Sequence, residues 1–120
     1  MKTRVLLALA SPEMNRVIDH LLLELPGVEI VGRSATSIDL GREAARLAPD
    51  VIVTSVRLLR RQGELRELRR FAPASKLIVI TCDGGMCDRD TRAADASLEE
   101  EDLVRSLLPI LHTLAPAERI

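Results

Sequence analysis

Short apolar runs alternate along the chain with stretches in which apolar residues recur every three or four positions. The runs at residues 5–9, 28–31, 51–56 and 77–80 are mostly aliphatic, as strands covered on both faces of a parallel sheet must be. The stretches between them have the spacing of amphipathic helices. Strands alternating with helices predict right-handed crossovers and an open α/β sandwich of four or five parallel strands.

Capping and helix-breaking residues set the predicted helix boundaries. Ser11 and Pro12 suit the cap and first position of a helix that ends at Pro26-Gly27. Further helices are predicted at about 38–47 and 65–71, the second with an apolar face ending in Phe71. The segment 97–100, Ser-Leu-Glu-Glu, is typical of a capping box that opens a last helix. Between 81 and 97 the pattern is irregular, and residues 93–96 favour at most a weak edge strand.

Composition narrows the class of protein. A chain of 120 residues and 13.2 kDa predicts one domain. The net charge of -1 and a single aromatic residue, Phe71, argue against base stacking and non-specific nucleic-acid binding, so no direct DNA binding is expected. No apolar run is long enough for a membrane span. Two closely spaced cysteines fit a reducing compartment, and we expect a cytoplasmic protein.

Several segments, in order and spacing, carry a family resemblance. They are residues 4–8, 11–12, 27–32, 48–53 and 76–81, together with Gly63. From about residue 4 to residue 111 the chain resembles a response-regulator receiver domain of the CheY-like type. The resemblance implies a (βα)5 flavodoxin-like sandwich with strand order 2-1-3-4-5. It assigns residues 1–114 to an atypical receiver domain and residues 115–120 to a tail or the start of a linker.

The resemblance also implies a phosphorylation pocket, and the sequence departs from it at four of five positions. The family's two carboxylates for Mg²⁺ correspond to Leu9 and Ala10, its phosphoacceptor aspartate to Ser55, and its lysine to Ala96. Only the hydroxyl of Thr81 is kept. A serine hydroxyl forms no acyl phosphate and is a poor Mg²⁺ ligand. We therefore expect an aspartate-less receiver with no catalytic residue, metal or cofactor.

A second departure is in length. The family has about twenty residues between the Thr81 and Ala96 positions, and this chain has fewer. The difference predicts that helix 4 of the fold is shortened or missing and that the fifth strand is a weak edge strand. Because these elements form the family's usual interaction face, we expect that face to be rebuilt.

Charge is separated along the chain. Six arginines against two glutamates give residues 57–70 a local balance of +4, and eight acids against two arginines give residues 83–102 a balance of -6. The candidate interaction residues are Arg57, Arg60, Arg61, Arg66, Arg69 and Arg70, and Glu99, Glu100, Glu101 and Asp102. The separation favours steering of a partner or a second copy, head to tail. A solvated helix face with i,i+3 and i,i+4 ion pairs explains the arginines equally well.

Two function classes follow. The first is a pseudo-receiver that is not phosphorylated and acts as a signalling interaction module, self-associating as a dimer and contacting an unidentified protein. The alternative is a small redox- or metal-responsive protein that uses Cys82 and Cys87. A phosphatase loop is disfavoured, since Arg89 lies one position too late for Cys-x5-Arg.

Overall fold

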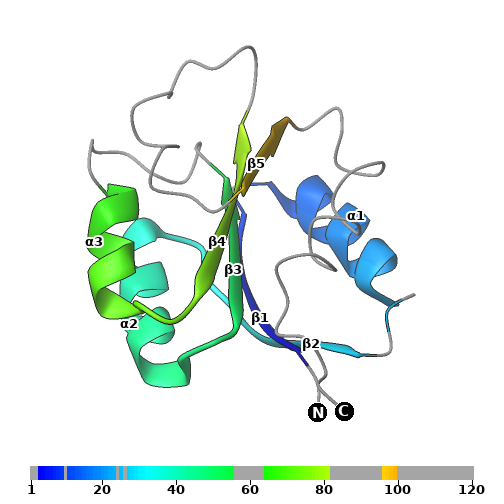
Figure 1. Cartoon of the computed structure of the whole chain (residues 1–120). Coiled ribbons are helices and arrows are strands. Elements are labelled where there is room, and N and C mark those ends of the chain that lie inside the picture. The colour runs from blue at the N-terminus through cyan, green and yellow to red at the C-terminus, as the bar shows by residue number, and fades with distance from the viewer. Residues whose placement is uncertain are drawn as a thin grey trace.

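The computed structural model describes residues 3–9, 11–23, 25, 27–55, 64–81 and 96–99. In chain order the described elements are β1 (Thr3–Ala8), α1 (Pro12–Leu23), β2 (Val28–Arg33), α2 (Ser37–Leu47), β3 (Val51–Ser55), α3 (Glu64–Phe71), β4 (Lys76–Thr81) and β5 (Ala96–Glu99). The strands form one sheet with the order β2-β1-β3-β4-β5, in which every neighbouring pair is parallel (Figure 1). The predicted fold class and strand order are confirmed.

Side chains alternate between the two faces of the sheet and make two apolar layers. Figure 1 shows α1 on one face and α2 with α3 on the other. The α1 layer contains Val5, Leu7, Leu9, Met14, Ile18, Leu22, Val51, Val53, Ile78 and Ile80. The α2–α3 layer contains Leu6, Ala8, Leu40, Ala44, Ile52, Leu68, Ala72, Leu77 and Val79. Successive strand residues enter opposite layers, which explains why the strands are apolar at nearly every position.

The start of α1 follows the sequence prediction. Ser11 Oγ accepts hydrogen bonds from the backbone N–H of Glu13 at 3.1 Å and of Met14 at 3.2 Å. Pro12 occupies the first helical position, where no N–H is needed. The cap places Leu9 and Ser11 at the point where β1 passes into α1.

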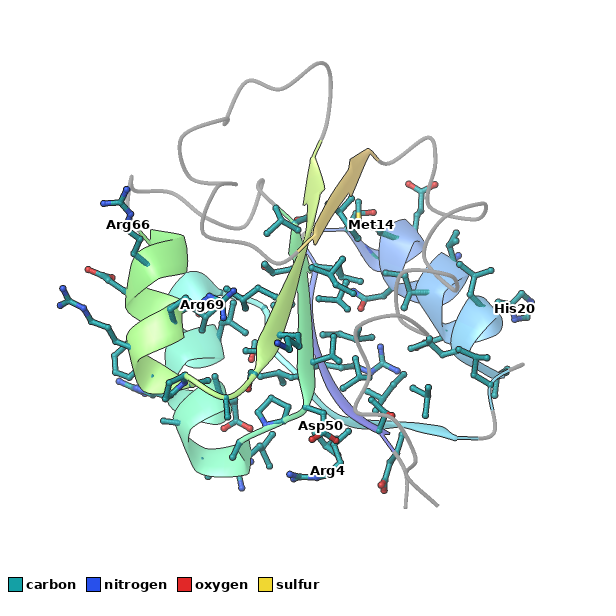
Figure 2. All side chains as sticks on the ribbon, in the orientation of Figure 1. Arg4, Met14, His20, Asp50, Arg66 and Arg69 are labelled. Carbon is teal, nitrogen blue, oxygen red and sulfur yellow. The ribbon has the colours of Figure 1, made fainter. Side chains whose placement is uncertain are left out.

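Arg4 and Asp50 hold the amino ends of β1 and β3 to the end of α2 (Figure 2). Arg4 N donates to Asp50 Oδ2 at 2.8 Å, and Asp50 N donates to Arg4 O at 2.9 Å. The guanidinium of Arg4 donates to the carbonyls of Leu47 at 2.7 Å and Ala48 at 3.2 Å. It thereby satisfies carbonyls that the helix end leaves unpaired. Ala48 ends α2 with φ 46° and ψ 58°, a left-handed conformation that favours glycine.

The pairing of β1 with β2 contains a bulge. Val5 pairs with Ile30 and Leu6 pairs with Gly32, which leaves Val31 without a partner on β1. Next to the bulge, the backbone of β2 lies close to α2: a Cβ added at Gly32 would be 3.0 Å from Leu47 Cδ1. β2 is the outer strand on this side of the sheet.

The fifth strand lies at the edge of the sheet, as predicted, but in a different place. Ala96–Glu99 forms β5, so the capping box predicted at residues 97–100 is wrong. Ser97 pairs with Val79 and Glu99 with Thr81. Pairing with the edge of β4 gives residues 96–99 several backbone hydrogen bonds. Together these stabilise the strand by more than the roughly 1 kcal/mol that a helix cap at Ser97 would contribute. The shortened helix 4, the last helix and the tail at 115–120 lie outside the described residues and stay predictions.

Candidate functional site

The carboxyl ends of β1, β3 and β4 meet at one edge of the sheet, where ligands bind in open parallel sheets. Ala8 pairs with Thr54, and Leu9 and Ser55 are the next residues along these two strands. Ser55 in turn pairs with Ile80, and Thr81 follows it as the last residue of β4. The structure therefore brings Leu9, Ser55 and Thr81 to one edge, as the sequence predicted.

Leu9 is part of the apolar core at this edge. Its exposed fraction is 5%, and it belongs to the same buried layer as Met14 and Ile80. A hard divalent cation needs several oxygen ligands, and Leu9 supplies none. Among the described residues, no group of three or more His, Cys, Asp or Glu lies where it could hold a metal ion. The described part of the edge does not fit Mg²⁺.

Ser55 is fully buried at the end of β3, and its hydroxyl is isolated. Within the part of the chain that the structure describes, Ser55 Oγ has no hydrogen-bond partner, and the same holds for Thr54 Oγ1 and Ser34 Oγ. A nucleophilic serine needs an adjacent base, which Ser55 lacks there. By contrast, the buried hydroxyl of Ser75 donates to the carbonyl of Pro49. An unpaired buried hydroxyl costs about 1–3 kcal/mol, so Ser55 contributes nothing to stability through its oxygen.

Ala96 lies at the beginning of β5 and pairs with Ile78. The end of that strand, where the receiver resemblance expects a lysine, is Glu99. Glu99 comes 18 positions after Thr81, close to the spacing that the resemblance implies. The strand bounds thus put Glu99 at the carboxyl end of β5, and the assignment of Ala96 to the lysine position stays a prediction.

The predicted interaction residues are only partly described. Arg66 and Arg70 are exposed on α3, and Arg69 is half-buried, with its guanidinium 3.5 Å from the carbonyl of Ser75. Phe71, which ends the predicted apolar face of this helix, has an exposed fraction of 56%. The remaining candidates lie outside the described residues: Ala10, Arg57, Arg60, Arg61, Cys82, Cys87, Glu100, Glu101 and Asp102.

Solved structures share this architecture over nearly the whole chain. The response regulator domain of Thermotoga maritima CheB has a TM-score of 0.80 and 17% identity, and the match covers 95% of this chain and 96% of that one. A LuxR-family response regulator from Aurantimonas has a TM-score of 0.76 and 20% identity, with 94% and 87% covered. This chain has the receiver-domain fold.

Sequence comparison finds longer curated proteins, each of which matches this chain over part of its own length. No family model matches the chain. It is 34% identical over 101 residues to a protein-glutamate methylesterase/protein-glutamine glutaminase of Alkalilimnicola ehrlichii, a match that covers 81% of this chain and 26% of that protein. A protein of the same description from Geobacter metallireducens is 30% identical over 99 residues, with 79% and 28% covered. The chain thus spans about a quarter of the length of the curated relatives it matches.

The expectation of no direct DNA binding is contradicted, because a protein that shares this fold is solved bound to DNA. RcsB of Salmonella enterica, with a TM-score of 0.82 and 17% identity over 94% of this chain and 98% of that one, is solved bound to the promoter rprA. In a second DNA-bound RcsB structure the match covers 64% of the RcsB chain, so that chain extends beyond the shared receiver fold. The net charge and aromatic content of a receiver domain say nothing about DNA binding by further segments of the same protein. Among the described helices, none combines the length and apolar character needed to cross a membrane.

Proposed function

We propose that this receiver-fold chain accepts no phosphoryl group and signals through contacts with proteins, including copies of itself. The observation that carries the proposal is the burial of Leu9 in the apolar layer beneath the carboxyl edge of the sheet. The receiver resemblance expects a solvated carboxylate at this position. Here an aliphatic side chain fills the space instead.

Phosphoryl transfer depends almost entirely on charge. Positive groups must neutralise the phosphoryl oxygens, and a carboxylate must accept the phosphoryl group. In this chain Ser55 offers a buried hydroxyl without a described partner, and the strand end beside Thr81 carries Glu99. An acid at that point repels a phosphoryl group, whereas a lysine would attract it. These features together support loss of phosphotransfer.

The proposal assigns no catalytic reaction to this chain. The esterase and glutaminase activities are named for relatives of which the chain spans about a quarter. We propose that residues 1–114 act as a binding domain, in the cytoplasm, and that residues 115–120 lead into a linker. The separation of charge between residues 57–70 and 83–102 supports self-association.

Beryllofluoride with Mg²⁺ tests the proposal directly. Amide resonances of Ser55 and Thr81 are followed by NMR during titration, and intact mass is measured after incubation with acetyl phosphate. We expect no saturable shift and no mass increase. The receiver domain of RcsB, a protein solved in the presence of this phosphate mimic, is the positive control. Mg²⁺-dependent, saturable shifts at both residues would overturn the proposal.

A further inference from the structure

The outer face of α2 and α3 carries an exposed apolar centre. Phe71, the single aromatic residue of the chain, is 56% exposed at the end of α3. Its ring lies against α2 at Gly41, where an added Cβ would sit 3.4 Å from Phe71 Cδ2 and Cε2. Ile38 precedes Gly41 by about one helical turn and is 68% exposed. The two side chains offer an apolar surface to solvent. We call Ile38, Gly41 and Phe71 the α2–α3 centre.

Three exposed arginines lie on the same two helices as this centre. Arg42 is exposed on α2, and Arg66 and Arg70 are exposed on α3, from which Arg66 points away from the sheet (Figure 2). Among the described side chains none of these three forms an ion pair, whereas Arg46 binds Glu43 at 2.6 Å. Among the described side chains, these two helices therefore carry exposed arginines without an ion pair as well as exposed apolar residues, together with the exposed acids Asp39 and Glu67. Exposed aromatic residues and arginines dominate the energetics of protein–protein interfaces, and fully buried contacts lie near the centre.

α3 itself contributes little to the core. Leu68 is its buried side chain among those described, and Ala72 follows directly after the helix. If α3 served only to cover the sheet, we would expect the large apolar side chain of Phe71 to face the sheet and pack into the aliphatic core. The outward position of Phe71 instead leaves its ring available to a partner.

The complementary chemistry is an acidic segment that also carries apolar side chains. The chain has one at residues 98–104, Leu-Glu-Glu-Glu-Asp-Leu-Val. Its first residues belong to β5, the edge strand on the far side of β4 from β3. Phosphate groups of a nucleic acid would satisfy the arginines but would leave Phe71 and Ile38 without a partner. A protein segment satisfies both.

We propose that the α2–α3 centre and its arginines in one copy bind the acidic segment 98–104 of a second copy, head to tail. This inference rests on the self-association in the proposed function and names the two surfaces that carry it. Because the surfaces differ, each complex leaves one of each kind open. Such heterologous contacts extend into open chains unless the rotation closes a ring. The mass should therefore keep rising with concentration and should not stop at a dimer.

The test uses sedimentation velocity of the whole chain over a wide concentration range at low salt. We expect Phe71→Ser to weaken association by about tenfold or more. The matched control is Leu23→Ser, which removes a 78% exposed apolar side chain on α1 and should change nothing. Arg70→Ala is a second variant of the same face, in case Phe71→Ser unfolds the chain. High salt should weaken association, because the arginines contribute through charge.

Mixing two defective variants decides between head-to-tail contact and any symmetric dimer. Phe71→Ser retains the acidic segment, and the double variant Glu100→Lys/Glu101→Lys retains the α2–α3 centre. Each alone should associate at least about tenfold more weakly than the wild type, and an equimolar mixture should regain tight association as 1:1 dimers that do not grow further. Association of the wild type that both variants leave intact would overturn the two surfaces while leaving the proposed self-association standing.

Two other outcomes also overturn the inference. A wild type that is monomeric at every concentration removes self-association itself, while the beryllofluoride titration still decides phosphotransfer separately. A DNA duplex that binds the chain more tightly than a second copy does, with loss on Arg70→Ala, would make nucleic acid the occupant of the face.

Discussion

Replacing Leu9 by aspartate puts back the carboxylate that the receiver resemblance expects at the end of β1. If the position were open to solvent, the change would cost little. In the structure Leu9 is 5% exposed within the layer formed with α1. The loss of a buried leucine at the rim of a core is worth about 2–3 kcal/mol. An unsatisfied buried carboxyl group adds about 1–3 kcal/mol even when it is protonated. The expected total, about 3–6 kcal/mol, is a large part of a typical domain's stability.

The same substitution should make stability depend on pH. Burial disfavours the charged form and raises the pKa of the introduced carboxyl above its unfolded value of about 3.9. Between those two values the folded state binds more protons than the unfolded state. The free energy of unfolding of Leu9→Asp, measured relative to that of the wild type, is therefore highest below pH of about 4. It falls as the pH rises, by about 1.4 kcal/mol per pH unit, until the pH passes the raised pKa of the folded state.

Urea unfolding measures both effects, and far-UV circular dichroism must report it because the chain has neither Trp nor Tyr. The matched control is Leu9→Asn, which has nearly the same size and polarity but no titrating group. It should lose a similar amount of stability with no dependence on pH beyond that of the wild type. The reasoning is refuted if Leu9→Asp unfolds within about 0.5 kcal/mol of the wild type across the pH range. Leu9 would then lie in an open pocket, and the proposed loss of phosphotransfer would lose its main support.

Five further substitutions, at Ser55, Ser75, Ala48, Ala45 and Arg4, test other contacts by the same urea assay. Ser55→Ala should leave the free energy of unfolding unchanged or raise it by up to about 1 kcal/mol, since it removes an unpaired buried hydroxyl; Ser75→Ala, which removes a satisfied one, should lower it by about 1–2 kcal/mol. Ala48→Gly should raise it by about 0.5–1 kcal/mol at a left-handed residue, whereas Ala45→Gly inside α2 should lower it by about 1 kcal/mol. Arg4→Met should lower it by about 1–2 kcal/mol and speed amide exchange at the end of α2, and unchanged exchange there would count against the capping contact.

The central strands were predictable because their sequence signal and their burial agree. Residues 51–53 and 77–80 are apolar at every position, and both faces of the sheet are covered there. The fifth strand was placed too early, since Ala96–Glu99 contains a helix-start pattern and its pairing partner on β4 lies far away in the sequence. A sequence pattern within four residues contains no information about that pairing with β4.

The candidate site was predictable in position but not in its physical state. The order of segments placed Leu9 and Ser55 at the carboxyl edge, and the strand register confirms that they are neighbours there. The burial of Leu9 and the missing partner of Ser55 Oγ depend on residues from other elements. Helical spacing likewise put Phe71 on the same apolar face as Leu68, although Leu68 is buried and Phe71 is exposed. The ring of Phe71 packs against Gly41 on α2. This contact depends on how the two helices lie together, so neither sequence segment alone predicts it.

The bulge at Val31 restricts how the sheet can grow. A straight, unbroken outer strand would present a regular ladder of free amides and carbonyls, on which an extended chain from another molecule could align. At Val31 the spacing of those groups is interrupted and the local twist increases, so only short stretches on either side stay in step. Fibrous aggregation by strand addition at β2 is thereby discouraged.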